Sequence, residues 1–74
     1  MLSEKLRQII DQVAERKGFV ISHIVIRTGT LIFRNPQTSY TARIKEDDAF
    51  IANENGSEAL REYLDREFDK RRHS

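Results

Sequence analysis

The sequence contains no cysteine, no tryptophan and only one proline among its 74 residues. Without cysteine the chain can form neither a disulfide nor a zinc site built on thiolates, and it is compatible with a reducing compartment. No apolar run approaches the roughly 20 residues that a membrane-spanning helix needs, and the first residues lack the apolar core of a secretory signal. We therefore expect a cytoplasmic protein without a membrane partner.

Acidic residues are absent from Phe19 to Lys45, a stretch that holds four basic residues. In contrast, residues 46–69 hold nine acidic and two basic residues, and this segment sums to −7. The formal net charge of +1 therefore hides a basic middle and an acidic second half. Such asymmetry indicates binding partners rather than an inert surface.

The length of 74 residues allows one domain with a small core. A domain of this size buries only about 60% of the surface that its unfolded chain exposes, so contact with a partner or a second copy would add useful stability. We expect a single compact domain over residues 1–70 and a short basic tail over residues 71–74.

The first segment, Ser3 to Lys17, has apolar residues at helical spacing and charged residues over the rest of the cylinder. Ser3 is a suitable N-cap, and Gly18 suits the left-handed position that closes a helix. The pattern predicts an amphipathic helix whose apolar stripe consists of Leu6, Ile9, Ile10 and Val13.

From Phe19 onward β-branched and aromatic residues dominate, and Thr28-Gly29 interrupts the run where a two-residue hairpin loop belongs. In the register set by that loop, Val25 lies opposite Ile32. One face of the hairpin then carries His23, Val25, Arg27, Thr30, Ile32 and Arg34. The opposite face carries the aliphatic and aromatic residues Ile24, Ile26, Leu31 and Phe33.

A third strand is predicted over residues 39–45, after a turn at residues 35–38. In the expected register Phe33 meets Tyr40, and Arg43 lies beside Thr30 on the opposite face. The acidic run at residues 46–48 predicts a second turn, and Ala49 to Asn53 is expected to return as a short fourth strand. A last helix, ending near Lys70, has the inner stripe Leu60, Tyr63, Leu64 and Phe68.

These elements predict a two-layer α+β domain of the order α-β-β-β-(β)-α, with both helices on one face of an antiparallel sheet. The other sheet face is left uncovered, with an aliphatic stripe that includes Ile21, Val25, Ile32 and Ile51. Exposed apolar patches often mark contacts, and cations border this one. The candidate partner-binding residues are His23, Val25, Arg27, Ile32, Arg34, Arg43 and Lys45.

Three interpretations of that face stay open. Aliphatic and Arg residues on a strand can be an ordinary solvated surface. An aliphatic centre with an Arg rim also matches a protein contact, with another protein or with a second copy. Nucleic acid is the third, because Arg and Lys neutralise phosphates, although only Phe19 offers a ring for stacking on bases. A further alternative is that the acidic second half docks on a basic groove.

The order helix, three strands, helix loosely resembles the double-stranded RNA-binding domain in layout across nearly the whole chain. That family grips phosphates with lysines at the start of its last helix, whereas here the matching turn reads Ser57-Glu58-Ala59-Leu60-Arg61-Glu62. Two carboxylates at this place would repel phosphate. The resemblance is therefore limited to layout.

Catalytic and metal-binding patterns are weak. The only histidines, His23 and His73, give no frame for a nucleophile, base and orienter. The acids at 46–48 lack the spacing of a calcium loop, and no Gly-rich phosphate loop is present. We expect no enzyme and no cofactor or metal, but a small binding protein of the accessory, regulator or inhibitor type found in phages, plasmids and bacteria. Direct nucleic-acid binding through the basic sheet face is the alternative.

Overall fold

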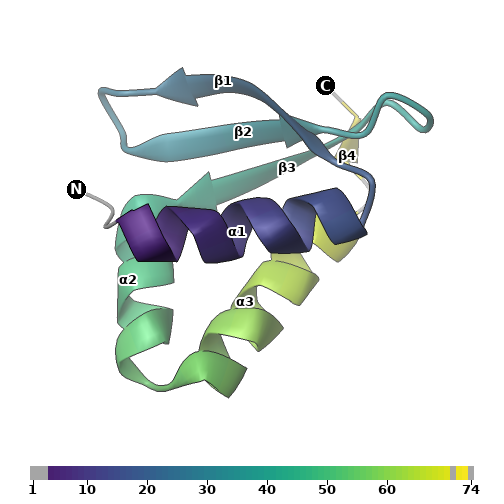
Figure 1. The fold of residues 1–74 in the computed structure, drawn as a ribbon. Helices are drawn as coiled ribbons and strands as arrows, with labels where there is room; N and C mark the ends of the chain where they lie inside the picture. Colours follow the sequence, from purple (N-terminus) through teal and green to yellow (C-terminus); the bar gives the residue numbers. More distant parts are fainter. Residues whose placement is uncertain (1–3, 71, 74) are drawn as a thin grey trace.

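The computed structural model describes residues 4–70 and 72–73 of the chain; the expected N-cap Ser3, together with Arg71 and Ser74 of the expected tail, lies outside the described residues. The elements in chain order are α1 (Glu4–Arg16), β1 (Val20–Val25), β2 (Thr30–Arg34), β3 (Tyr40–Lys45), α2 (Glu46–Glu54), α3 (Ser57–Asp69) and β4 (Arg72–His73). The sheet is an open antiparallel meander in the order β1-β2-β3-β4, and the helices pack on one side of it (Figure 1). The predicted two-layer α+β fold is confirmed.

The first helix forms as its apolar spacing predicts. α1 buries Leu6, Ile10, Val13 and Ala14 against the rest of the core. Gly18 adopts a φ of 82°, the left-handed conformation that ends a helix without a Cβ clash. The next amide, Phe19 N–H, then donates to the Ala14 carbonyl at 2.8 Å and turns the chain toward β1.

The predicted hairpin is correct in its strands and wrong in its register. The loop spans four residues, Ile26 to Gly29, because Gly29 takes the left-handed conformation with a φ of 64° and its carbonyl accepts from Glu46 N–H at 2.8 Å. Val25 therefore lies opposite Thr30 and not opposite Ile32. Ile26, expected opposite Leu31 in the core, is 89% exposed at the loop.

The pairing of β2 with β3 is also displaced by two residues from the prediction. Phe33 lies opposite Ala42, where Tyr40 was expected, and Ile32 lies opposite Arg43. The turn is longer than expected because Asn35 Oδ1 accepts from the amides of Gln37 at 2.9 Å and Thr38 at 3.3 Å. A shift of two residues keeps each side chain on its predicted face, since side chains alternate along a strand.

The predicted fourth strand over Ala49–Asn53 is wrong, because these residues lie in α2. Three acidic residues in the first turn favour a helix start through the helix dipole. Within α2, the small side chains of Ala49 and Ala52 are buried, and they allow close packing on β3 and α3. Phe50, on the other side of α2, is 53% exposed.

The last helix provides the centre of the core. α3 buries Leu60, Leu64 and Phe68 along the predicted stripe, while Tyr63 is half-buried. The Phe68 ring lies 5.2 Å from the rings of both Phe19 and Phe33 between centroids. The helix begins after Gly56, and no side chain caps its first turn. β4, within the predicted tail, pairs with the start of β3.

Candidate functional site

The sheet face opposite the helices is defined here as the outer face. Its side chains follow from the register, because directly opposite residues of antiparallel strands point to the same side. Across the three long strands, the outer face consists of three rows, which are Val20, Arg34 and Thr41; His23, Ile32 and Arg43; and Val25, Thr30 and Lys45. The alternate residues Leu31, Phe33, Ala42 and Ile44 are buried beneath the helices.

The structure brings six of the seven predicted site residues onto the outer face. The exception is Arg27, which lies in the four-residue loop at the end of the sheet. Val25 and Ile32 are partly buried by their neighbours, and Figure 1 shows all three helices on the other side of the sheet. The six residues are His23, Val25, Ile32, Arg34, Arg43 and Lys45.

Two residues expected in the aliphatic stripe lie elsewhere. Ile21 pairs with Phe33 and faces the helix side, because a β-bulge between Ile21 and His23 inserts Ser22 and reverses the alternation. Ile51 lies on α2. The outer face is therefore less apolar than predicted, and its aliphatic part consists of Val20, Val25 and Ile32.

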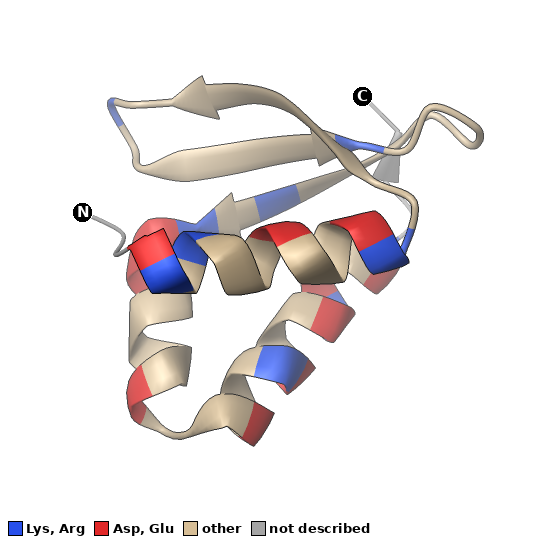
Figure 2. Ribbon diagram, viewed as in Figure 1, with Lys and Arg blue, Asp and Glu red and all other residues tan. Residues whose placement is uncertain are grey.

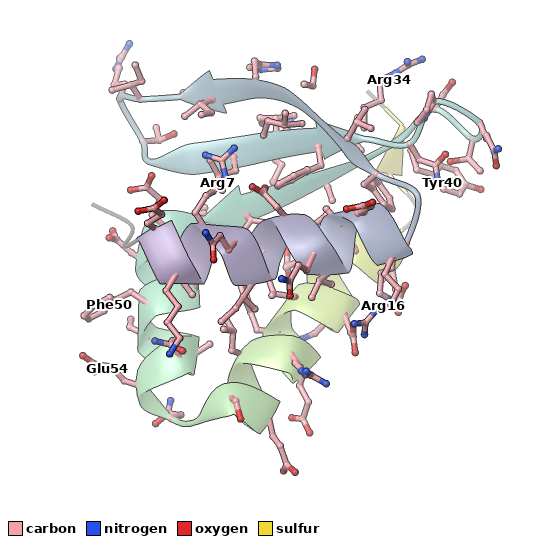
Figure 3. All side chains as sticks on the ribbon, viewed as in Figure 1. Arg7, Arg16, Arg34, Tyr40, Phe50 and Glu54 are labelled. Carbon is pink, nitrogen blue, oxygen red and sulfur yellow. The ribbon has the colours of Figure 1, made fainter. Side chains whose placement is uncertain are left out.

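The outer face is cationic and contains no acidic side chain. Figure 2 shows the three long strands without a red segment, while α1 and α3 carry both colours and α2 carries red alone. Within residues 4–70, the cations Arg34, Arg43 and Lys45 form no ion pair. Arg34 donates to Ser39 Oγ at 3.3 Å and points away from the helices (Figure 3). Charge on this face is thus available for an external partner.

The β3 edge of the sheet carries both signs of charge. Arg43 and Lys45 line a cavity of about 310 Å³ there, together with Asp48, Tyr63, Glu67 and Lys70. Lys70 Nζ lies 2.7 Å from Glu67 Oε2, so that one carboxylate of the cavity already has a partner. Carboxylates beside Arg43 and Lys45 weaken this end of the face as a site for phosphate.

Tyr63 joins the last helix to this edge. Its hydroxyl oxygen accepts from Lys45 N–H at 3.3 Å. Burial raises the pKa of Tyr63 to about 12, because the charged phenolate is poorly solvated there, and the hydrogen bond from Lys45 opposes the shift. Nearby Asp48 and Glu67 add to the increase. Tyr63 is therefore a neutral structural group at physiological pH rather than a nucleophile.

An exposed apolar edge was missed by the sequence reasoning. Five of the six residues of β1 are exposed, and Val20, Ile21 and Ile24 have exposed fractions of 56%, 42% and 44%. Ile24 pairs with buried Leu31, yet it lies beyond the area that the helices cover. The uncharged run Val20–Val25 was the available sequence signal, but alternation alone assigned Ile24 to the core.

Other kinds of site are not evident in the part of the chain that the structure describes. Over those residues no group of three His, Cys, Asp or Glu side chains is placed to hold a metal ion. The described helices include none that is both long and apolar enough to cross a membrane. Phe19, the ring considered for stacking on bases, is 7% exposed and belongs to the core.

Comparison with known proteins gives no relative for this arrangement. No protein-family model, no curated protein and no solved structure matches the chain.

Proposed function

We propose that the chain is a non-catalytic binding protein that contacts a partner protein through the outer face of its sheet. The observation that carries this proposal is the middle of that face, where Ile32 lies between His23 and Arg43 and none of the described helices lies above it. Aliphatic contact area beside unpaired Arg side chains is the composition of a protein interface. Such a contact fits an accessory, regulatory or inhibitory role.

The chemistry of the face supports one kind of partner. Val25 and Ile32 require an apolar surface opposite them, while Arg34, Arg43 and Lys45 require carboxylates around it. Arg43 is central because it shares a row with Ile32 and is exposed. We infer an acidic protein surface with a small apolar centre as the binding partner.

Nucleic acid is the second candidate, supported by the absence of acidic side chains on β1, β2 and β3. The outer rows contain no aromatic side chain for stacking, and Asp48 and Glu67 share a cavity with two of the three cations. Both features favour protein over single-stranded nucleic acid. Three phosphate contacts on duplex DNA would give a slope of about −2.7 in log affinity against log salt.

The experiment is affinity capture from native lysate with matched variants, followed by binding measurements on the captured protein. Arg43→Glu should reduce binding at least about tenfold, because a carboxylate would repel the acidic partner. Arg61→Glu, an exposed change on α3, is the control and should bind as the wild type does. Equal binding by both variants contradicts the proposal. Titration of duplex DNA and single-stranded RNA tests the second candidate, which requires binding with the stated salt slope.

A further inference from the structure

The two edges of the sheet differ. At one edge both ends of β3 are occupied, because Tyr40 and Thr41 pair with β4 and Lys45 N–H donates to the Tyr63 hydroxyl. At the other edge β1 pairs with β2 alone, and among the described residues no further strand follows it. An edge strand presents backbone N–H and C=O groups that can accept another strand.

Proteins usually protect such edges with charged side chains, proline or bulges. β1 contains no Lys, Arg, Asp, Glu or Pro, and its only such device is the bulge at Ser22. Exposed aliphatic side chains lie on both faces of the strand, since Val20 points outward and Ile21 and Ile24 point to the helix side. The edge therefore offers both hydrogen-bonding groups and apolar area.

The sequence of β1 is symmetric about its centre. It reads Val-Ile-Ser-His-Ile-Val, so the strand begins with Val-Ile whether it is read forwards or backwards. The bulge extends this symmetry to the faces: Val20 and Val25 lie on the outer face, and Ile21 and Ile24 lie on the helix face. Without the inserted Ser22, residues three apart would point to opposite sides.

We propose that two copies of the chain pair through β1, antiparallel about a two-fold axis, to form one continuous sheet. A two-fold interface places the same surface patch on both sides, so a strand that matches its own reverse is complementary to itself. In this register Ile21 lies opposite Ile24 of the second copy, and Val20 lies opposite Val25 of the second copy. Ser22 and His23 meet at the axis.

A second copy fits this edge better than an unrelated peptide does. In the proposed register every aliphatic residue faces an aliphatic residue on the same side of the sheet, for both copies at once. No charge on the strand opposes its own copy across the axis. The pairing uses the edge and leaves Arg34, Arg43 and Lys45 exposed, so the dimer would present two outer faces side by side. This inference is independent of the partner of the outer face.

The first test is oligomeric state by analytical ultracentrifugation over a concentration series. The wild type should show a concentration-dependent dimer, and Ile24→Lys should weaken association at least about tenfold, because Lys on an edge blocks strand pairing. Ile24 is 44% exposed, so circular dichroism should show an unchanged fold. The matched control is Phe50→Lys, a change at a 53% exposed apolar residue on α2, and it should dimerise normally.

The second test reads the register with disulfides, which the cysteine-free chain permits without background. A mixture of the Ile21→Cys and Ile24→Cys chains should form a mixed disulfide under mild oxidation, because the register places these Cβ atoms about 5 Å apart. In a dimer of either variant alone, the two equivalent cysteines lie about 10 Å apart along the strands. Their disulfide should therefore form at least about tenfold more slowly than the mixed disulfide. The control mixes Ile24→Cys with Phe50→Cys.

Three results would overturn the inference. The first is a wild type that stays monomeric up to about 1 mM, because the dissociation constant of the dimer would then lie above that concentration. The second is a dimer that Ile24→Lys leaves intact while Phe50→Lys disrupts it. The third is a mixed disulfide that forms no faster than the disulfide of Ile24→Cys with Phe50→Cys.

Discussion

β1 and β3 are both six residues long and both pair with β2, yet their environments differ. β3 lies under α2 and α3 and buries Ala42 and Ile44 to 1% and 0% exposure. β1 packs mainly on β2 and keeps five of its six residues exposed. The helix layer is narrower than the sheet and leaves most of β1 uncovered. β1 is therefore stabilised by its hydrogen bonds to β2 more than by burial of its side chains. The domain thus has a structural edge and an edge available for contacts.

The largest predicted effect compares two isoleucines in one row of the sheet. Ile44 and Ile24 both lie next to Leu31 on the helix side, but Ile44 is 0% exposed and Ile24 is 44% exposed. Ile44→Ala should lower the free energy of unfolding by about 2–5 kcal/mol, because it leaves a cavity. Ile24→Ala should cost less than about 1 kcal/mol, since little area is lost. Urea unfolding of dilute, monomeric protein measures both, and equal losses would contradict the contrast.

A smaller effect on stability is predicted for Gly29, in the loop that joins β1 to β2 and contacts the start of α2. Gly29 has a φ of 64°, and a Cβ there would lie 3.4 Å from Glu46 Oε2. Gly29→Val should cost about 1–2 kcal/mol, because β-branched residues are strained in the left-handed region. Gly29→Asn should cost less, since Asn adopts this conformation more readily. Thermal unfolding of the two variants tests this explanation. Backbone strain predicts a larger loss of stability for Gly29→Val than for Gly29→Asn, whereas crowding against Glu46 predicts equal losses.

The smallest effect concerns the ion pairs that hold the end of α1 to α3. Lys17 Nζ lies 2.9 Å from Asp69 Oδ1 and 3.6 Å from Asp65 Oδ1. Because the carboxylates are more than half exposed, Lys17→Met should cost about 0.2–1 kcal/mol, and less at high salt. Lys5→Met, on the exposed side of α1, is the control.

The same ion pairs predict that the contribution of Lys17 to the free energy of unfolding depends on pH. The hydrogen bond with Asp69 raises the pKa of Lys17 above its ordinary value of 10.5, while partial burial opposes this shift. A raised pKa means that the folded state holds the proton more tightly. The stabilisation is therefore complete below pH 10.5 and is lost as the pH rises through the folded-state value. The difference between wild type and Lys17→Met should shrink over that interval; a constant difference would assign Lys17 a packing role.

The sequence predicts the layers of this fold well because apolar periodicity marks them. The stripes Leu6–Ile10–Val13 and Leu60–Leu64–Phe68 both lie in the core. The faces of β2 and β3 are also correct, although their register is not. An error of two residues preserves alternation, so Arg43 and Lys45 lie on the outer face as predicted.

What the sequence does not predict depends on contacts between distant segments. The four-residue loop and the start of α2 are joined by the hydrogen bond from Glu46 N–H to the Gly29 carbonyl, which no local pattern indicates. Short α2 buries only Ala49 and Ala52, too few for a recognisable helical stripe. The exposure of Ile21 and Ile24 on β1 follows from the width of the helix layer, a property of packing rather than of the β1 sequence.

The most direct test of the two-edge account is amide hydrogen exchange, measured strand by strand at low and high protein concentration. In dilute solution the amides of β1 that face away from β2 should exchange much faster than those of β3 at Ala42 and Ile44, because β1 is exposed and no described strand pairs with it on that side. At high concentration β1 should gain protection while β3 stays unchanged. Equal protection of β1 and β3 in dilute solution, or protection of β1 that does not depend on concentration, would contradict the account.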